Sequence, residues 1–97
     1  ALLGFAPRLA GAPDRAELER RVTGNADDLA ARELLAARLA LSGNAEDALE
    51  QYLEILRRDR GYGDDAGRKG LLAMFELLGN GGPLVNRYRS QMFTLLH

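Results

Sequence analysis

Short polar and glycine-rich clusters cut this chain into segments, each about one helix long. Glycine and asparagine tolerate the backbone conformations that end helices, and aspartate, asparagine and serine accept hydrogen bonds from the free amides at helix starts. The chain therefore favours a series of short helices joined by tight turns. The clusters are Thr23-Gly24-Asn25, Ser42-Gly43-Asn44, Gly61-Tyr62-Gly63 and Gly79-Asn80-Gly81-Gly82.

Apolar residues recur at helical spacing between these clusters and give each segment one apolar stripe. Pro83 suits the first position of the last helix, because an amide there would have no partner within the helix. Threonine, valine and isoleucine are sparse, so no strands are predicted. We predict an all-α fold of about five helices in antiparallel hairpins, forming a single domain of residues 1–97. The predicted elements are an N-terminal extension of residues 1–13 and helices at 14–22, 27–41, 45–59, 65–78 and 83–96.

Acidic and amide side chains stand where the predicted helices begin. Each can accept a hydrogen bond from a free backbone amide of the first turn. Neighbouring carboxylates such as Asp64 and Asp65 also suit acid–base chemistry, but their place at a helix start makes capping the better interpretation. The predicted caps are Asp14 with Glu17, Asn25 or Asp27, Asn44, and Asp64 with Asp65.

Composition excludes several classes of function. The 13 basic and 14 acidic residues nearly cancel, so no net field draws this chain toward nucleic acid or an anionic membrane. There is no cysteine, which removes disulfides and thiol chemistry. The only histidine is His97, the last residue, which is poorly placed to serve as a metal ligand or catalytic base. We therefore expect a protein without enzyme activity, cofactor, metal, nucleic-acid partner or membrane partner.

Residues 28–59 contain an ordered pattern of small and large side chains across two helices. Ala36 and Ala48 are the small residues, which let the two backbones approach closely. This order resembles a tetratricopeptide repeat, although Arg32 stands where that pattern often has tryptophan and no proline closes the unit near Arg60. The matching positions are Leu35, Ala36, Leu39, Gly43, Ala48, Tyr52 and Ile55.

A looser second unit follows, and residues 14–22 look like the second helix of a truncated preceding unit, which makes about two and a half repeats. The runs ILRRDRG (55–61), DDAGRKGLL (64–72) and PLVNRYR (83–89) resemble the C-terminal end of YbbN-type proteins, also called CnoX. In that family a thioredoxin-like domain precedes a tetratricopeptide-like domain. The second unit's positions are Leu72, Phe75, Gly79, Leu84 and Tyr88.

The resemblance covers about residues 14–97 and implies a bacterial, cytoplasmic co-chaperone that holds unfolding clients and delivers them to a chaperonin. It also implies a thioredoxin-like domain ahead of Ala1 in the full-length chain. Since the sequence starts without methionine, we expect it to be a fragment or a processed chain.

The last predicted helix offers the candidate binding site. A terminal repeat usually has a polar outer face, yet Met92, Phe93, Leu95 and Leu96 fall within five positions here. Four large apolar residues so close together cannot all face the core, so packing and partner binding both stay open. The candidate partner-binding residues are Arg87, Arg89, Gln91, Met92, Phe93 and Leu96.

Three functions remain open from the sequence. The chain is an interaction domain of a co-chaperone, a regulatory or substrate-positioning module of an enzyme whose catalytic domain precedes Ala1, or a self-association unit. The residues upstream separate the first two, since a thioredoxin-like pattern supports the former and another catalytic motif the latter. Light scattering tests the third by detecting a stable dimer.

The small residue on the third predicted helix gives a first test. Replacing Ala48 with leucine should destabilise the fold by about 1–3 kcal/mol, because extra volume at a close helix contact overpacks it. Denaturant unfolding followed by circular dichroism measures the change. A chain that tolerates Ala48→Leu would contradict the assignment of residues 28–59 to a helix-pair repeat.

Overall fold

Five α-helices make up most of residues 9 and 11–96, the part of the chain that this computed structural model describes. No strand occurs in those ranges, so the predicted all-α fold of helical hairpins is confirmed. Most of the predicted extension, residues 1–8 and 10, and the terminal His97 lie outside the described residues. The helices are α1 (Arg15–Gly24), α2 (Leu29–Leu41), α3 (Ala45–Arg58), α4 (Tyr62–Leu77) and α5 (Pro83–Leu96).

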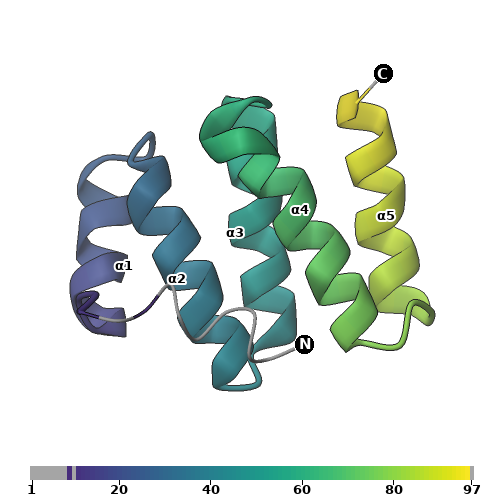
Figure 1. The fold of residues 1–97 in the computed structure, drawn as a ribbon, viewed down its shortest axis with the longest axis horizontal. Helices are drawn as coiled ribbons and strands as arrows, with labels where there is room; N and C mark the ends of the chain where they lie inside the picture. The colour runs from purple at the N-terminus through teal and green to yellow at the C-terminus, as the bar shows by residue number, and fades with distance from the viewer. Residues whose placement is uncertain (1–8, 10, 97) are drawn as a thin grey trace.

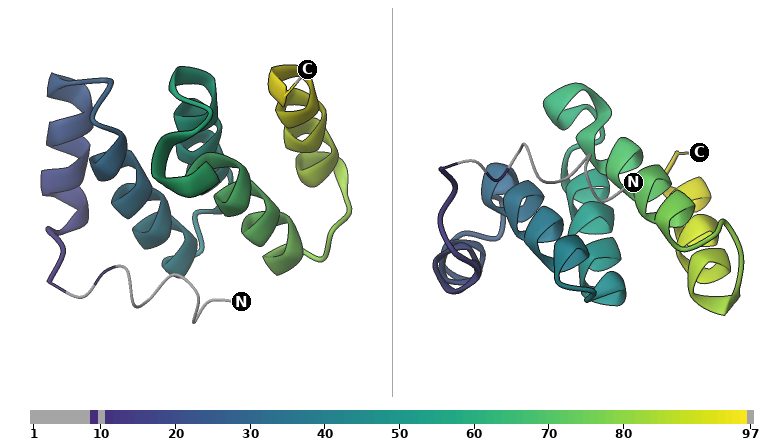
Figure 2. Two further views of the ribbon diagram at one scale, coloured as in Figure 1. Left: turned by 45° about the horizontal axis from the view of Figure 1, so that its top comes forward. Right: turned by 60° about the horizontal axis from the view of Figure 1, so that its bottom comes forward.

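The helices follow one another in a row, with α1 and α5 at opposite ends (Figures 1 and 2). Helix α3 is the central element, because it packs against α2, α4 and α5. The core consists of the faces that these helices turn toward one another, with Leu18 as the fully buried contribution of α1. Like α1 at the other end of the row, α5 therefore has neighbouring helices on its inner side only, as far as the structure describes the chain.

Helix α1 begins directly after Asp14, the residue that the sequence predicts as its cap. The Glu17 amide donates to Asp14 Oδ1 at 2.9 Å. Glu17 was also predicted to reach back to the helix start, but its carboxylate accepts from Arg20 Nη2 at 2.5 Å. That hydrogen bond and the charge of Arg20 lower the pKa of Glu17. An arginine one turn away attracts the carboxylate more strongly than a neutral amide does.

The next two caps differ from the predictions. Helix α2 is capped by Asp28, whose Oδ1 accepts from the Ala31 amide at 3.1 Å, and not by Asn25 or Asp27. Asn25 instead closes the turn before the helix, since its Oδ1 accepts from the Asp27 amide at 3.1 Å. Asn44 occupies the cap position of α3, but its side chain donates to Ser42 Oγ and caps no amide.

Helix α4 starts with a distorted turn. Gly63, Asp64 and Asp65 have φ angles of 59°, 59° and 64°, in the left-handed region, so the regular helix begins after them. The two aspartates do not cap it as predicted. Asp64 Oδ2 lies 2.9 Å from Lys69 Nζ and Asp65 Oδ2 lies 3.6 Å from Arg68 Nη2. Aspartate tolerates the left-handed conformation better than most residues, which explains its place in this turn.

The predicted repeat positions lie in the core between α2 and α3. Ala36 and Ala48 are both fully buried, and the large residues at the other positions are buried as well. Gly43 has a φ of 82°, a conformation that suits glycine in the turn between the helices. In the second unit Phe75 and Tyr88 are buried, whereas Leu72 is 41% exposed. Leu72, which the sequence assigns to a position of the second unit, is therefore not a core residue.

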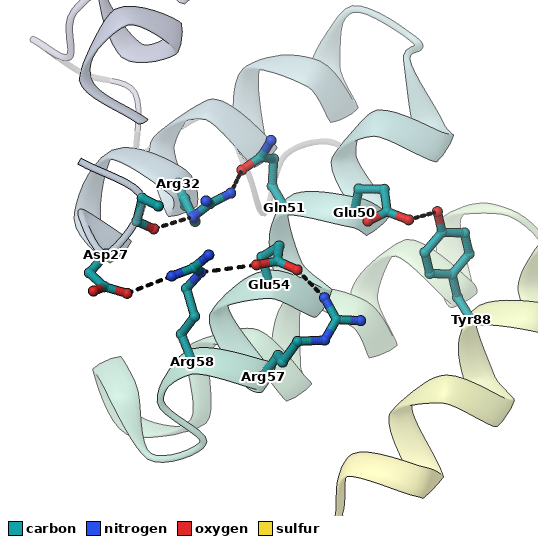
Figure 3. A network of polar contacts seen from close by, with 9 residues as sticks. Asp27, Arg32, Glu50, Gln51, Glu54, Arg57, Arg58 and Tyr88 are labelled. Carbon is teal, nitrogen blue, oxygen red and sulfur yellow. Dashed lines mark hydrogen bonds and ion pairs between the residues drawn. The ribbon is translucent and has the colours of Figure 1, made fainter. Parts of the chain in front are cut away.

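Arg32 takes the place of the large aromatic residue that the repeat pattern often has. Its side chain is only 7% exposed. Its Nε donates to the Ala26 carbonyl and its Nη1 donates to Gln51 Oε1, each at 2.9 Å. Figure 3 shows the Gln51 contact. The guanidinium thus ties the turn before α2 to α3, which explains why a charged residue is tolerated there.

Helices α3 and α4 approach each other through glycine. A Cβ atom built on Gly67 would lie 2.8 Å from the Leu56 backbone nitrogen. One built on Gly70 would lie 2.2 Å from Cδ1 of the Tyr52 ring. The backbone of α4 therefore lies directly on α3, with the Tyr52 ring filling the space that a side chain at position 70 would need.

The contact at Gly70 generates a stability prediction. Replacing Gly70 with alanine should destabilise the fold by about 1–3 kcal/mol, because the added methyl group overlaps the buried Tyr52 ring. Chemical denaturation measures the change. Gly81→Ala is the matched control, since nothing lies within 4 Å of a Cβ there. If alanine at position 70 raises stability, as helix propensity alone predicts, the close contact is not as described.

Candidate partner-binding site

The inner face of α5 packs against α3 and α4. Val85, Tyr88 and Met92 are its buried residues, with Met92 only 3% exposed. Of the two roles that the sequence leaves open for Met92, core packing and partner binding, the structure therefore favours core packing. Spacings of three and four positions between these residues place them on one side of the helix.

Two polar contacts fix α5 to the acidic side of α3. The Tyr88 hydroxyl donates to Glu50 Oε1 at 2.5 Å, as Figure 3 shows. One turn earlier on α3, Glu46 accepts from Arg87 Nη2 at 2.8 Å. The Arg87 guanidinium also lies 5.0 Å from the centre of the Tyr88 ring. Arg87, predicted to meet a partner, is thus engaged within the fold.

These contacts change the proton affinity of both α5 groups. Burial, followed by the hydrogen bond to Glu50, raises the pKa of Tyr88 to about 12. Loss of the proton would leave a buried phenolate beside a carboxylate, which explains the direction. The hydrogen bond to Glu46 raises the pKa of Arg87, so its guanidinium stays charged throughout the accessible pH range.

The outer face of α5 carries an exposed aromatic ring. Phe93 is 50% exposed, the largest exposed fraction among the large apolar residues that the structure describes. An open hollow of about 400 Å³ lies beside it. An aromatic side chain at the edge of a hollow is the kind of anchor on which protein contacts depend. The residues lining the hollow are Asn86, Arg89, Ser90, Phe93 and Thr94.

Arg89 belongs to the hollow and keeps a cationic group beside Phe93. Its Nη2 donates to the Asn80 carbonyl at 3.3 Å, and its guanidinium lies 5.3 Å from the centre of the Phe75 ring. These partners orient the side chain without neutralising its charge. The hollow therefore combines an apolar surface with a positive edge.

The other predicted residues lie nearer the core. Gln91 and Leu96 are half-buried, and neither lines the hollow. Leu96 packs against the core, and the neighbouring Leu95 carbonyl accepts from Arg60 Nη2 at 2.7 Å. The site thus retains Arg89 and Phe93 from the predicted set.

Asn86, Ser90 and Thr94 were missed as members of the site. They recur every four positions along α5, which is the spacing of one helix face. That spacing was available in the sequence. The choice between this face and the opposite one depended on which residues α3 covers, and tertiary packing decides that.

A second polar cluster joins the turn before α2 to the last turns of α3. Arg58 contacts both Asp27 Oδ1, at 2.7 Å, and Glu54 Oε2, at 2.9 Å, and Arg57 pairs with the other oxygen of Glu54 (Figure 3). Burial acts to raise the pKa of Glu54, but the hydrogen bond to Arg58 and the charges of both arginines outweigh it, so the pKa is lowered. The charged groups of this cluster pair with one another, so the cluster is not a candidate binding site.

The part of the chain that the structure describes holds no group of three or more histidine, aspartate or glutamate side chains placed to bind a metal ion. No helix there is both long and apolar enough to cross a membrane. The family model for tetratricopeptide repeats matches residues 8–97. No curated protein and no solved structure matches the chain significantly.

The Tyr88–Glu50 contact predicts a loss of stability at alkaline pH. Because the pKa of Tyr88 is 10 in the unfolded chain and about 12 in the folded one, its contribution is complete below pH 10 and is lost progressively toward pH 12. We expect the difference in unfolding free energy between the unmodified chain and Tyr88→Phe to shrink across that window. Denaturant unfolding at a series of pH values measures it. A difference that stays constant from pH 10 to 12 would show that Tyr88 titrates normally.

Proposed function

Because this chain belongs to the tetratricopeptide repeat family, whose repeats generally mediate contacts between proteins, we propose that it is the protein-interaction domain of a thioredoxin-like co-chaperone. The observation that supports this proposal is the hollow on the outer face of α5, with Phe93 half exposed beside it. In this role the domain binds and positions other proteins and performs no catalysis of its own.

The outer face of α5 has the features of a contact centre. Phe93 gives up part of its exposed apolar surface when a partner covers it, and burial of that surface stabilises the complex. Arg89 supplies a charged group at the edge, where it acts on the association rate and on partner orientation. Asn86, Ser90 and Thr94 offer short polar groups around the ring. A buried aromatic anchor with a polar rim is the common organisation of protein interfaces.

The finer part of the proposal rests on the motif resemblance to YbbN-type proteins. The matching runs lie at the end of α3, in the first half of α4 and at the start of α5. We propose that a thioredoxin-like domain precedes this one in the full-length protein. The partners are then unfolding clients and a chaperonin in the bacterial cytoplasm. An enzyme module and a self-association unit are the competing functions. The binding experiment includes an outcome that favours self-association, and the residues upstream of Ala1 distinguish the enzyme module.

The binding test compares an exposed apolar residue with a buried one. Phe93→Ala should weaken binding to a purified bacterial chaperonin by about 1–3 kcal/mol while leaving the melting temperature nearly unchanged, because Phe93 is half exposed. Calorimetry measures the affinity, and thermal unfolding measures the stability. Met92→Ala should lower the stability of the fold by about 2–5 kcal/mol, because it leaves a cavity in the core. Its effect on stability should exceed its effect on chaperonin affinity.

Leu72→Ala is the matched control, since Leu72 is also a largely exposed apolar residue but belongs to α4. It should change neither quantity. If Phe93→Ala binds the chaperonin and a heat-unfolded reporter protein as tightly as the unmodified chain does, the α5 surface is not the contact. A concentration-independent dimer that Phe93→Ala dissociates would favour self-association.

A further inference from the structure

The segment before α1 lies against α2 and is held there by one arginine. Arg38 Nε donates to the Pro13 carbonyl at 2.7 Å, and its Nη2 donates to the Ala12 carbonyl at 3.1 Å. The Ala12 amide donates to the Leu9 carbonyl at 3.0 Å, and the Leu9 side chain packs against the core. We refer to Leu9 and Gly11–Pro13 as the strap.

The side chain of Arg38 donates hydrogen bonds to the main chain of the strap. A guanidinium presents several donors in a planar fork, and here two of them reach two successive carbonyl oxygens. Every polypeptide carries such carbonyls, so this contact places little restriction on sequence. The one side-chain requirement that the strap shows is Leu9, an aliphatic residue four positions before Pro13. The strap is therefore an example, within the same chain, of a ligand read by its backbone.

A comparison with Arg32 on the same helix shows that the Arg38 contact is not needed to satisfy a buried charge. Arg32 is 7% exposed, and burial lowers its pKa, so its carbonyl and amide partners offset the cost of burying the charge. Arg38 is only half-buried, and water can replace its partners at small cost. Leu9 is also only partly buried, and Gly11 is exposed. Ala12 and Pro13 are half-buried, so no residue of the strap is fully buried.

We propose that the surface of α2 around Arg38 is a binding site for an extended polypeptide segment, read by two successive main-chain carbonyls and one aliphatic side chain. The strap occupies this site in the unliganded chain and competes with a partner segment. This inference rests on the proposed protein-binding function and specifies one class of partner: unfolded chain, which exposes both carbonyls and aliphatic residues. It concerns α2 and is independent of the α5 surface.

The test uses the strap's own sequence as the probe. The acetylated and amidated peptide Leu-Ala-Gly-Ala-Pro-Asp, which corresponds to residues 9–14, is titrated into the full 97-residue chain. The Arg38 Nε–Hε resonance in a ¹⁵N NMR spectrum reports occupancy. Leu9→Ser should increase the affinity by about tenfold, because it weakens a competitor of high effective concentration. Arg38→Gln in the same background should lower the affinity by about tenfold, through loss of the charged fork; this binding is followed by the peptide's own resonances.

Two controls separate recognition from folding. Arg57→Gln removes an arginine that pairs with Glu54 and should leave peptide binding unchanged. A peptide with a reduced Ala–Pro bond lacks the carbonyl equivalent to that of Ala12, and it should bind the Leu9→Ser chain about fivefold more weakly. Because this comparison keeps Arg38, it decides the matter even if Arg38→Gln fails to fold.

The proposal is overturned if the Leu9→Ser chain shows no saturable shift with the peptide, or if the reduced-bond peptide binds equally well. Phe93→Ala should leave the peptide titration unchanged. A loss of chaperonin binding in Phe93→Ala together with an unresponsive Arg38 therefore refutes this inference alone. If Phe93→Ala binds the chaperonin normally while the Arg38 resonance responds to the peptide, only the proposed role of α5 is refuted.

Discussion

The close contact between α3 and α4 determines where the later elements lie. Gly67 and Gly70 remove the side chains that would otherwise hold the two helices apart, and the Tyr52 ring fills the space left at Gly70. Dispersion contacts accumulate only when surfaces fit without gaps, so this approach contributes both attraction and a fixed geometry. Since α4 leads through a short glycine-rich turn into α5, its position on α3 also places the last helix. The candidate site on α5 therefore depends on this packing relation as well as on the direct contacts between α5 and α3.

The rotation of α5 about its own axis is set by a mixture of apolar and polar contacts. Tyr88 and Met92 bury their side chains, and the Tyr88 hydroxyl must meet Glu50 to satisfy its hydrogen bond. Successive residues of a helix are about 100° apart, so fixing Met92 inward turns Phe93 out toward solvent. Phe93 is thus exposed because Tyr88 and Met92 pack on the opposite, inner face of α5.

The sequence was sufficient to predict the fold class because turn clusters and helical spacing are local signals. The small residues at 36 and 48 could be placed in the same way. Cap identities were predicted less well: Asp28 competes with Asp27 one position away, and the choice depends on how the preceding turn closes. The outward face of α5 could not be chosen from its sequence, since Met92 and Phe93 are equally apolar neighbours. Contacts from α3, distant in sequence, decide between them.

Arg38 and Arg89 differ from most other arginines of the fold in their partners. Arg57, Arg58 and Arg87 pair with carboxylates, which cancels their charge locally. Arg38 and Arg89 donate to carbonyls, which orient a guanidinium but carry no compensating charge. A chain with a formal net charge of −1 exerts little long-range attraction, so local groups of this kind must select its partners. The two arginines lie on helices separated by α3 and α4 in the row (Figure 1), so a segment bound at one need not displace a partner at the other.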